Sequence, residues 1–361
     1  MIQQVHYTPA TPKYNFPHPA TDTMLPLRFT EQSLQSLKHV QNHPFQKSPH
    51  DLQELSDPEQ YPETFRIKMQ PITLKPNREE TTIAACDTST IRIGETTTGI
   101  LIAVRGANVW KQQKSYHYSR LGPFIFHITE TNKKEVYRTL ERAYFDTPDA
   151  SNHPSFINLL QMPTRIANLL ERWLQSTLAK TISNGIILFD GSLTAGTADT
   201  PVHRMKEILA HANRRSNTVL AFSKMTNLRV DGYLITDIPT HSKPPYLLET
   251  TGLKTKPPTV LFGDVYVARL GHENYAFRLD IDKQAYTDRK IRAVEKLLGN
   301  DILLQGYPET LRLAHILCTF TANEVLAMQH FAVRRFGLRL IDRPDMHKLL
   351  FGPFGRGDYY S

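Results

Sequence analysis

Two apolar runs in this chain each end in an aspartate that is followed at once by small residues. Residues 186–189 precede Asp190, Gly191 and Ser192, and residues 82–86 precede Asp87. An apolar run bounded by a turn signal is typical of a buried strand, and ligands of α/β sheets bind at the carboxyl ends of strands. Taken singly, either aspartate has a simpler interpretation, because Asp-Gly is a common turn and an aspartate often caps one. The matched pair indicates a metal site.

A long helix predicted between these two strands carries a third carboxylate. It begins near Pro163 and ends near Ile182, before an Asn-Gly stop signal. Its apolar residues recur at three- and four-residue spacings: Ile166, Leu169, Leu170, Trp173, Leu174 and Leu178. At about 100° per residue, Glu171 lies at the edge of this stripe, where its carboxylate could point over the end of the sheet. An exposed Glu171 paired with Arg172 or Gln175 fits the same position equally well.

The elements that must position these residues follow an α/β order. Three successive strands, at residues 83–87, 99–109 and 116–129, favour an antiparallel meander. The remaining predicted elements are, in order, helix 134–145, the helix that carries Glu171, strand 186–190, helix 202–212, strand 218–223, a hairpin of strands 259–270 and 275–280, and helices 287–298, 309–320 and 322–336. The proline-containing stretch between residues 225 and 258 is predicted to be an insertion or lid.

Three segments are predicted from composition. Residues 1–78 hold 11 of the 24 prolines and are expected to form an arm or extension, with short helices at 30–37 and 51–55. Residues 79–350 form the main domain, and 351–361 form a Gly-rich, aromatic tail. The fold class predicted is α/β, a mixed sheet flanked by helices with a helical carboxyl-terminal part.

Composition limits the classes of protein that this chain can be. Hydrophobic residues make up 40%, and no apolar run of about 18 residues or signal-peptide pattern occurs, so a cytoplasmic protein without a membrane span is expected. Cys86 and Cys318 are the only cysteines, both in apolar surroundings, and are interpreted as buried packing residues. The net charge of +8 favours a polyanionic partner, although solvated helix faces also explain dispersed basic clusters.

A three-strand meander, then helices, then a strand that ends in a second aspartate is the order of elements along the chain of an RNase H-like nuclease. Carboxylate ligands suit Mg²⁺ or Mn²⁺, and two such ions about 4 Å apart stabilise the attacking and leaving oxygens of a phosphodiester displacement. Asp87, Glu171 and Asp190 supply three ligands. The chain has no Gly-x-x-x-x-Gly-Lys-[Ser/Thr] phosphate loop, so a processive nuclease would need a separate ATPase to drive DNA.

Over about residues 80 to 350, the chain resembles the NurA nucleases, which work with the HerA translocase in DNA end processing. The matching segments are Ala-Ala-Cys-Asp87-Thr-Ser, helical Glu171, Phe-Asp190-Gly-Ser-Leu, Phe-Ser-Lys224, Val265-Tyr-Val-Ala-Arg-Leu, Phe277-Arg-Leu-Asp280, and Gly306-Tyr-Pro-Glu-Thr-Leu leading to Ala314-His315. The family's first motif commonly reads Asp-Gly-Ser, whereas Thr88 stands in the glycine position here. The amino-terminal arm matches only loosely.

This resemblance implies an RNase H-like fold and Mn²⁺-dependent 5′ to 3′ exonuclease and single-strand endonuclease activity in double-strand break repair. It also implies a homodimer and a hexameric HerA-type ATPase as partner. His315 would be a fourth metal ligand, although a lone histidine on a helix is more often a structural residue. Lys224, Ser192 and Tyr307 would contact the DNA substrate.

Two alternatives stay open. The chain could be a catalytically weak DNA-binding or regulatory subunit of a translocase, although retention of the three carboxylates and His315 argues against a decayed site. It could also be an RNase H-like nuclease that acts on RNA or hybrids, because metal-assisted attack on a phosphodiester is common to these enzymes.

Overall fold

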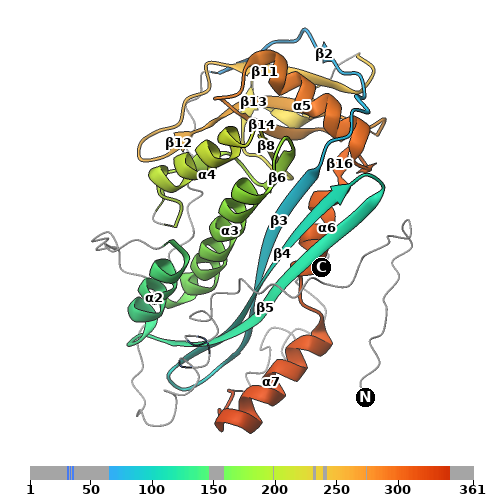
Figure 1. Ribbon diagram of the computed structural model, residues 1–361. Helices are drawn as coiled ribbons and strands as arrows, with labels where there is room; N and C mark the ends of the chain where they lie inside the picture. The colour runs from blue at the N-terminus through green and yellow to red at the C-terminus, as the bar shows by residue number, and fades with distance from the viewer. Residues whose placement is uncertain are drawn as a thin grey trace, which may run out of the picture.

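The computed structural model describes residues 65–145, 158–197, 199–230, 233–238, 242–273 and 275–341, together with 31, 33 and 35. Within these residues, the chain folds around one large mixed sheet flanked by helices (Figure 1). None of the described helices has the length and apolar character needed to cross a membrane. The mixed sheet and its flanking helices confirm the predicted α/β class.

The main sheet has ten strands in the described residues. Their order is β1-β11-β13-β14-β8-β6-β3-β4-β5, and β2 also pairs with β11. The strands are β1 (Arg66–Ile67), β2 (Ile72–Thr73), β3 (Ile83–Glu95), β4 (Gly99–Gln112), β5 (Ser115–Thr129), β6 (Ile186–Asp190), β8 (Thr218–Ser223), β11 (Tyr246–Thr251), β13 (Gly263–Arg269) and β14 (Phe277–Asp282). β3, β4 and β5 form the predicted antiparallel meander, and β6 and β8 continue it in parallel to β3.

Helices cover both faces of this sheet. They are α2 (Lys133–Phe145), α3 (Met162–Thr181), α4 (Val202–Arg214), α5 (Thr287–Asn300), α6 (Glu309–Cys318) and α7 (Ala322–Phe336). The apolar sides of α2, α3 and α4 pack in one core against one face of the sheet, and those of α5 and α6 pack in a second core on the other face (Figure 1). A strand that is covered by a core on each face has a nearly continuous run of apolar residues, and residues 186–189 of β6 are such a run.

The alternation of side chains along β3 and β6 decides which core each residue faces. Ala84 and Cys86 lie in the core of α3, whereas Ile83 and Ala85 lie in the core of α6. Because successive side chains of a strand point to opposite faces, Asp87 follows Ile83 and Ala85 towards α6. The same alternation on β6 places Asp190 on that face, since Ile186 and Leu188 belong to the α6 core.

The long meander also carries α7, which lies far from β6 and β8 at the other end of the long strands (Figure 1). Met328 and Ala332 of α7 pack on β3, β4 and β5 in a separate apolar cluster. The Arg105 guanidinium, buried on β4, donates 2.7 Å to the Glu324 carboxylate. Thr321 and Glu324 form a capping box at the first turn of α7, so one carboxylate joins the start of the helix to the sheet.

Two predictions of local structure were wrong. The first strand does not end at Asp87 but continues to Glu95, because its polar residues pair with β4 along an antiparallel ladder. The stretch 225–258 is not wholly an insertion, since it contains β11, which pairs with β13 inside the main sheet.

Other parts of the chain have smaller elements or lie outside the description. Within the described part of the chain, strands of two residues form three small sheets: β9 (Arg229–Val230) with β10 (Tyr233–Leu234), β7 (Thr194–Ala195) with β12 (Val260–Leu261), and β15 (Leu303–Leu304) with β16 (Tyr307–Pro308). Strands β1 and β2 come from the end of the predicted arm and join the main sheet through β11. The predicted helix at 51–55 and the tail at 351–361 lie outside the described residues.

Candidate metal centre

Asp87 and Asp190 occupy equivalent positions on neighbouring parallel strands. The register pairs Ile83 with Ile186 and Ala85 with Leu188, a constant offset of 186 − 83 = 103 residues. The same offset relates Asp87 to Asp190. Pairing between β3 and β6 stops at Ala85 and Leu188, two residues before the aspartates, so the carboxylates stand where the two strands part. The structure thus brings together the two residues that the sequence pattern singled out.

His315 comes to the same place from α6. Its Nδ1 lies 2.7 Å from Oδ2 of Asp87, and the His315 side chain is 51% exposed whereas that of Asp87 is 9% exposed. The other Asp87 oxygen, Oδ1, accepts a hydrogen bond of 2.7 Å from the Thr88 amide. His315 is therefore neither a core residue nor a remote surface residue, because one edge of its ring contacts the Asp87 carboxylate.

Glu171 approaches the aspartates from α3. Its pKa is raised to about 7, chiefly by burial; Arg172 lowers this pKa, and the charges of Asp87 and Asp190 contribute to raising it. The Glu171 side chain is 16% exposed, and its Oε1 accepts 2.9 Å from Gln175. Glu171 thus makes the contact with Gln175 that was expected of an exposed glutamate, but its side chain is largely buried. The helix is seated close to the sheet, where the Thr88 hydroxyl donates 3.4 Å to the Ala167 carbonyl.

Lys224 and Tyr307 complete the surroundings of Asp190. Lys224 follows β8, and its Nζ donates 2.7 Å to Oδ2 of Asp190 while the lysine side chain stays 42% exposed. The ammonium also lies 5.8 Å from the centroid of the Tyr307 ring. The Tyr307 hydroxyl is buried without a hydrogen-bond partner among the described residues. Burial, followed by the charges of Asp190 and Asp87, raises the pKa of this phenol well above its usual value.

The turn after Asp190 is fixed by a buried ion pair that was not assigned a role from the sequence. Gly191 has a φ of +95°, which favours glycine, and its amide donates 2.8 Å to the Phe222 carbonyl. The Leu193 amide donates 3.0 Å to Oδ2 of Asp280. Asp280 is wholly buried and accepts two hydrogen bonds of 2.8 Å from Arg278. The sequence signal for this pair was the presence of two opposite charges, Arg278 and Asp280, two residues apart in an otherwise apolar segment.

Ser192 and Cys318 lie beside the residues of the candidate metal centre. The Ser192 and Thr194 hydroxyls are 2.9 Å apart in the turn that follows Asp190. Cys318 is buried and free, as is Cys86, which confirms that neither forms a disulfide. The structure adds that Cys318 is close to His315 and Asp87, which its three-residue spacing from His315 on a helix could have indicated.

The donor set fits a divalent cation. Asp87 and Asp190 hold matched positions on neighbouring strands, and their charges add to the effect of burial in raising the pKa of Glu171 on α3. In the protein alone, Lys224 and His315 are the groups that partner two of the carboxylates. A bound cation would relieve the repulsion, and oxygen donors in the majority suit Mg²⁺ or Mn²⁺. Asp87, Glu171 and Asp190, with His315 beside them, are the residues that would hold it.

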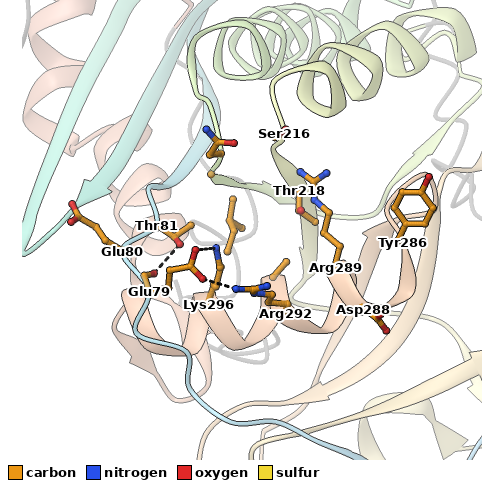
Figure 2. Close-up of a pocket in the computed structure, with 14 residues that line it drawn as sticks. Glu79, Glu80, Thr81, Ser216, Thr218, Tyr286, Asp288, Arg289, Arg292 and Lys296 are labelled. Atoms are coloured by element: carbon orange, nitrogen blue, oxygen red, sulfur yellow. Dashed lines mark hydrogen bonds and ion pairs between the residues drawn. The ribbon is translucent and has the colours of Figure 1, made fainter.

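A cavity of about 630 Å³ lies at the other end of the same strands (Figure 2). It is lined by Ile186 and Thr218, the first residues of β6 and β8, and by α5. Arg292 and Lys296 are directed at Glu79, with ion-pair distances of 2.8 and 3.1 Å (Figure 2). Two of its basic groups are thus paired with Glu79, a third, Arg289, donates 3.3 Å to the Asn217 carbonyl, and the residues that line the cavity are not those of the candidate metal centre.

Comparison with known proteins gives matches only among solved structures. No protein-family model matches the chain, and no curated protein matches its sequence. The structure is similar to the NurA nuclease from Sulfolobus solfataricus, with 15% identity and a TM-score of 0.44 over 73% of this chain and 88% of that one. Endonuclease V from Bacillus subtilis has 14% identity and a TM-score of 0.33 over 74% and 88%.

A NurA structure with manganese is also similar, with 11% identity and a TM-score of 0.27 over 74% of this chain and 93% of that one. The nuclease family that the sequence motifs resemble therefore recurs among the similar structures.

Proposed function

We propose that this chain is a divalent-metal-dependent nuclease that hydrolyses phosphodiester bonds of DNA. The observation that carries the proposal is the matched position of Asp87 and Asp190 on neighbouring strands, with His315 against Asp87 and with both aspartate charges acting on Glu171 of α3. A purely structural role does not account for two strand carboxylates and a helical glutamate whose negative charges act on one another. Bound Mg²⁺ or Mn²⁺, proposed as a pair, would supply a nucleophilic hydroxide and stabilise charge on the phosphate.

The residues have distinct roles in this proposal. Asp87 and Asp190, on neighbouring strands, would be ligands of the cations, and Glu171 would add a ligand from α3. His315 orients the Asp87 carboxylate through their 2.7 Å contact and supplies a further ligand nitrogen. Each carboxylate must be ionised to act, so Glu171 has to lose the proton that burial and its neighbours favour.

Lys224 is the residue whose partner changes when substrate binds. In the protein alone its ammonium donates to Asp190, and it is exposed enough to turn outwards. This exposed ammonium would contact the scissile phosphate when Asp190 serves as a metal ligand. Tyr307 lies on the same side, and its unpartnered hydroxyl can donate to a phosphate oxygen. Ser192 would contribute a hydroxyl from the Gly191 turn, where a Cβ added at the glycine would meet no atom within 4 Å, so that an approaching DNA backbone has room.

The finer parts of the proposal rest on the sequence resemblance to NurA nucleases. They are 5′ to 3′ exonuclease and single-strand endonuclease activity, a preference for Mn²⁺, a homodimer, a hexameric HerA-type ATPase as partner, and a role in resection at double-strand breaks. Cytoplasmic localisation and a domain spanning residues 79–350 belong to the same proposal.

The test is a cleavage assay on labelled single-stranded DNA, duplex DNA, RNA and hybrid duplexes with Mn²⁺ or Mg²⁺. Wild-type protein should cleave DNA, whereas Asp190→Ala should lower the rate by at least about 100-fold, because removing a group that acts with the metal costs several kcal/mol of transition-state stabilisation. Glu79→Gln is the matched control, since this carboxylate lies in the separate cavity and its loss should leave the rate unchanged. Undiminished cleavage by Asp190→Ala would contradict the proposal, and preference for RNA or hybrids would redirect it.

A further inference from the structure

Asp87, His315 and Cys318 form a ligand set of a different chemical character from the three carboxylates. One donor atom from each of these residues lies within 4.8 Å of the others. An oxygen, an imidazole nitrogen and a sulfur together are borderline-soft donors, which Mg²⁺ and Mn²⁺ disfavour and Zn²⁺ prefers. His315 and Cys318 are three residues apart on α6, so both face β3 from the same side of the helix.

The surroundings of Cys318 allow its sulfur to become a ligand. The thiol donates to the His315 carbonyl at 3.1 Å. That carbonyl also accepts 3.2 Å from the Thr319 amide and 2.8 Å from the Thr319 hydroxyl. It therefore keeps two donors when the thiol releases its proton to solvent and a sulfur–metal bond forms. His315, with its exposed side chain, gives an incoming ion a route to the buried sulfur.

We propose that Asp87, His315 and Cys318 bind Zn²⁺ or a similar thiophilic cation as a three-ligand site completed by water, and that this ion inhibits the nuclease. Three protein ligands and a water are a common arrangement for zinc. The ion takes Asp87 and His315 away from Asp190 and Glu171, so the carboxylate site can no longer assemble. The inhibitory effect rests on the proposed nuclease function, whereas binding of the ion does not.

The binding test uses Co²⁺ as a spectroscopic probe for zinc in metal-free, fully reduced, full-length protein. A thiolate ligand should give a sulfur-to-cobalt charge-transfer band in the near ultraviolet, which Zn²⁺ should abolish by displacing Co²⁺. Cys318→Ser and Cys318→Ala should both lack the band while keeping the wild-type circular dichroism spectrum. Cys86→Ser is the matched control, because the Cys86 side chain lies in the core of α3, and it should keep the band. Absence of the band in wild-type protein, or its persistence in Cys318→Ala, would overturn the site.

The inhibition test measures DNA cleavage in Mn²⁺ while Zn²⁺ is added. Cys318→Ser should cleave at a rate within about threefold of wild type but require at least about tenfold more Zn²⁺ for half-inhibition, a ratio that corresponds to about 1.4 kcal/mol. Equal Zn²⁺ sensitivity in the two proteins would overturn the inhibitory role. A wild-type protein with the cobalt band but without cleavage in any divalent ion would instead refute the nuclease function and leave the zinc site standing.

Discussion

Glu171 is the carboxylate of the candidate site whose pKa is raised by burial and by neighbouring charges together. Its pKa is raised from 4.5 to about 7 because the carboxylate is buried and because Asp87 and Asp190 oppose its charge. Between these pH values, the folded protein holds the proton while the unfolded chain has lost it. The free energy of unfolding in the absence of metal therefore falls as the pH rises from 4.5 to 7, and this loss is complete above pH 7.

Glu171→Gln should remove this pH dependence. In chelator, the variant should be more stable than wild type at pH 8.5 by up to about 3 kcal/mol, since one pKa unit corresponds to about 1.4 kcal/mol. The difference should shrink as the pH falls towards 4.5. Urea unfolding at several pH values measures it, and Mn²⁺ provides the control, because the ion should stabilise wild type far more than the variant. If the free energy of unfolding depended on pH in the same way in the two proteins, the pKa of Glu171 would not be raised in the folded state.

At the scale of elements, the turn that carries Asp190 depends on the buried pair of Arg278 and Asp280 on β14. Asp280→Ala leaves the Arg278 guanidinium buried without this partner and removes the acceptor of the Leu193 amide. We expect a loss of about 3–5 kcal/mol in the free energy of unfolding, measured in urea. The double variant Arg278→Met, Asp280→Leu should recover part of that stability, because an apolar pair carries no uncompensated charge.

Cleavage should not recover with stability in that double variant. The Leu193 amide still lacks its acceptor there, so the turn after Asp190 is not held in place. Assay of the folded double variant in Mn²⁺ distinguishes a positioning role from a structural one, since a purely structural pair would give wild-type activity once stability returns. Gly263 explains the close fit at this point, because a Cβ there would lie 2.6 Å from the Asp280 Cβ.

How well each element was predicted depends on whether its own residues or its neighbours determine it. The helices and the strands 186–190 and 218–223 were predicted nearly to their ends, because amphipathic periodicity and apolar runs are local properties. The second half of β3 is rich in threonine and serine, and only its ladder with β4 makes it a strand. β11 lies between proline-containing stretches and is likewise defined by pairing with β13, which no local pattern encodes.

At the scale of the whole molecule, the candidate site is assembled from segments far apart in the sequence. The two aspartates could be matched from their own surroundings, because parallel strands align their carboxyl ends. His315 is 228 residues from Asp87, and its contact follows from the path of α6 across the sheet. Only the family resemblance suggested it beforehand. The roles of Asp280 and Cys318 required the packed structure, since each depends on a neighbour from another element.

In the proposed nuclease, the net charge of the molecule predicts how DNA would bind in the absence of a metal. The chain carries a net charge of +8, and Asp190→Asn would release Lys224 from its ion pair to face the phosphates. We expect Asp190→Asn to bind fluorescent single-stranded DNA in chelator, and to lose at least about tenfold in affinity between 50 and 200 mM salt, because each phosphate contact releases counterions. Adding Lys224→Met to this variant should weaken binding and make the salt dependence shallower, as measured by fluorescence anisotropy. Binding that is insensitive to salt, or unchanged by Lys224→Met, would mean that DNA is held elsewhere than over this end of the sheet.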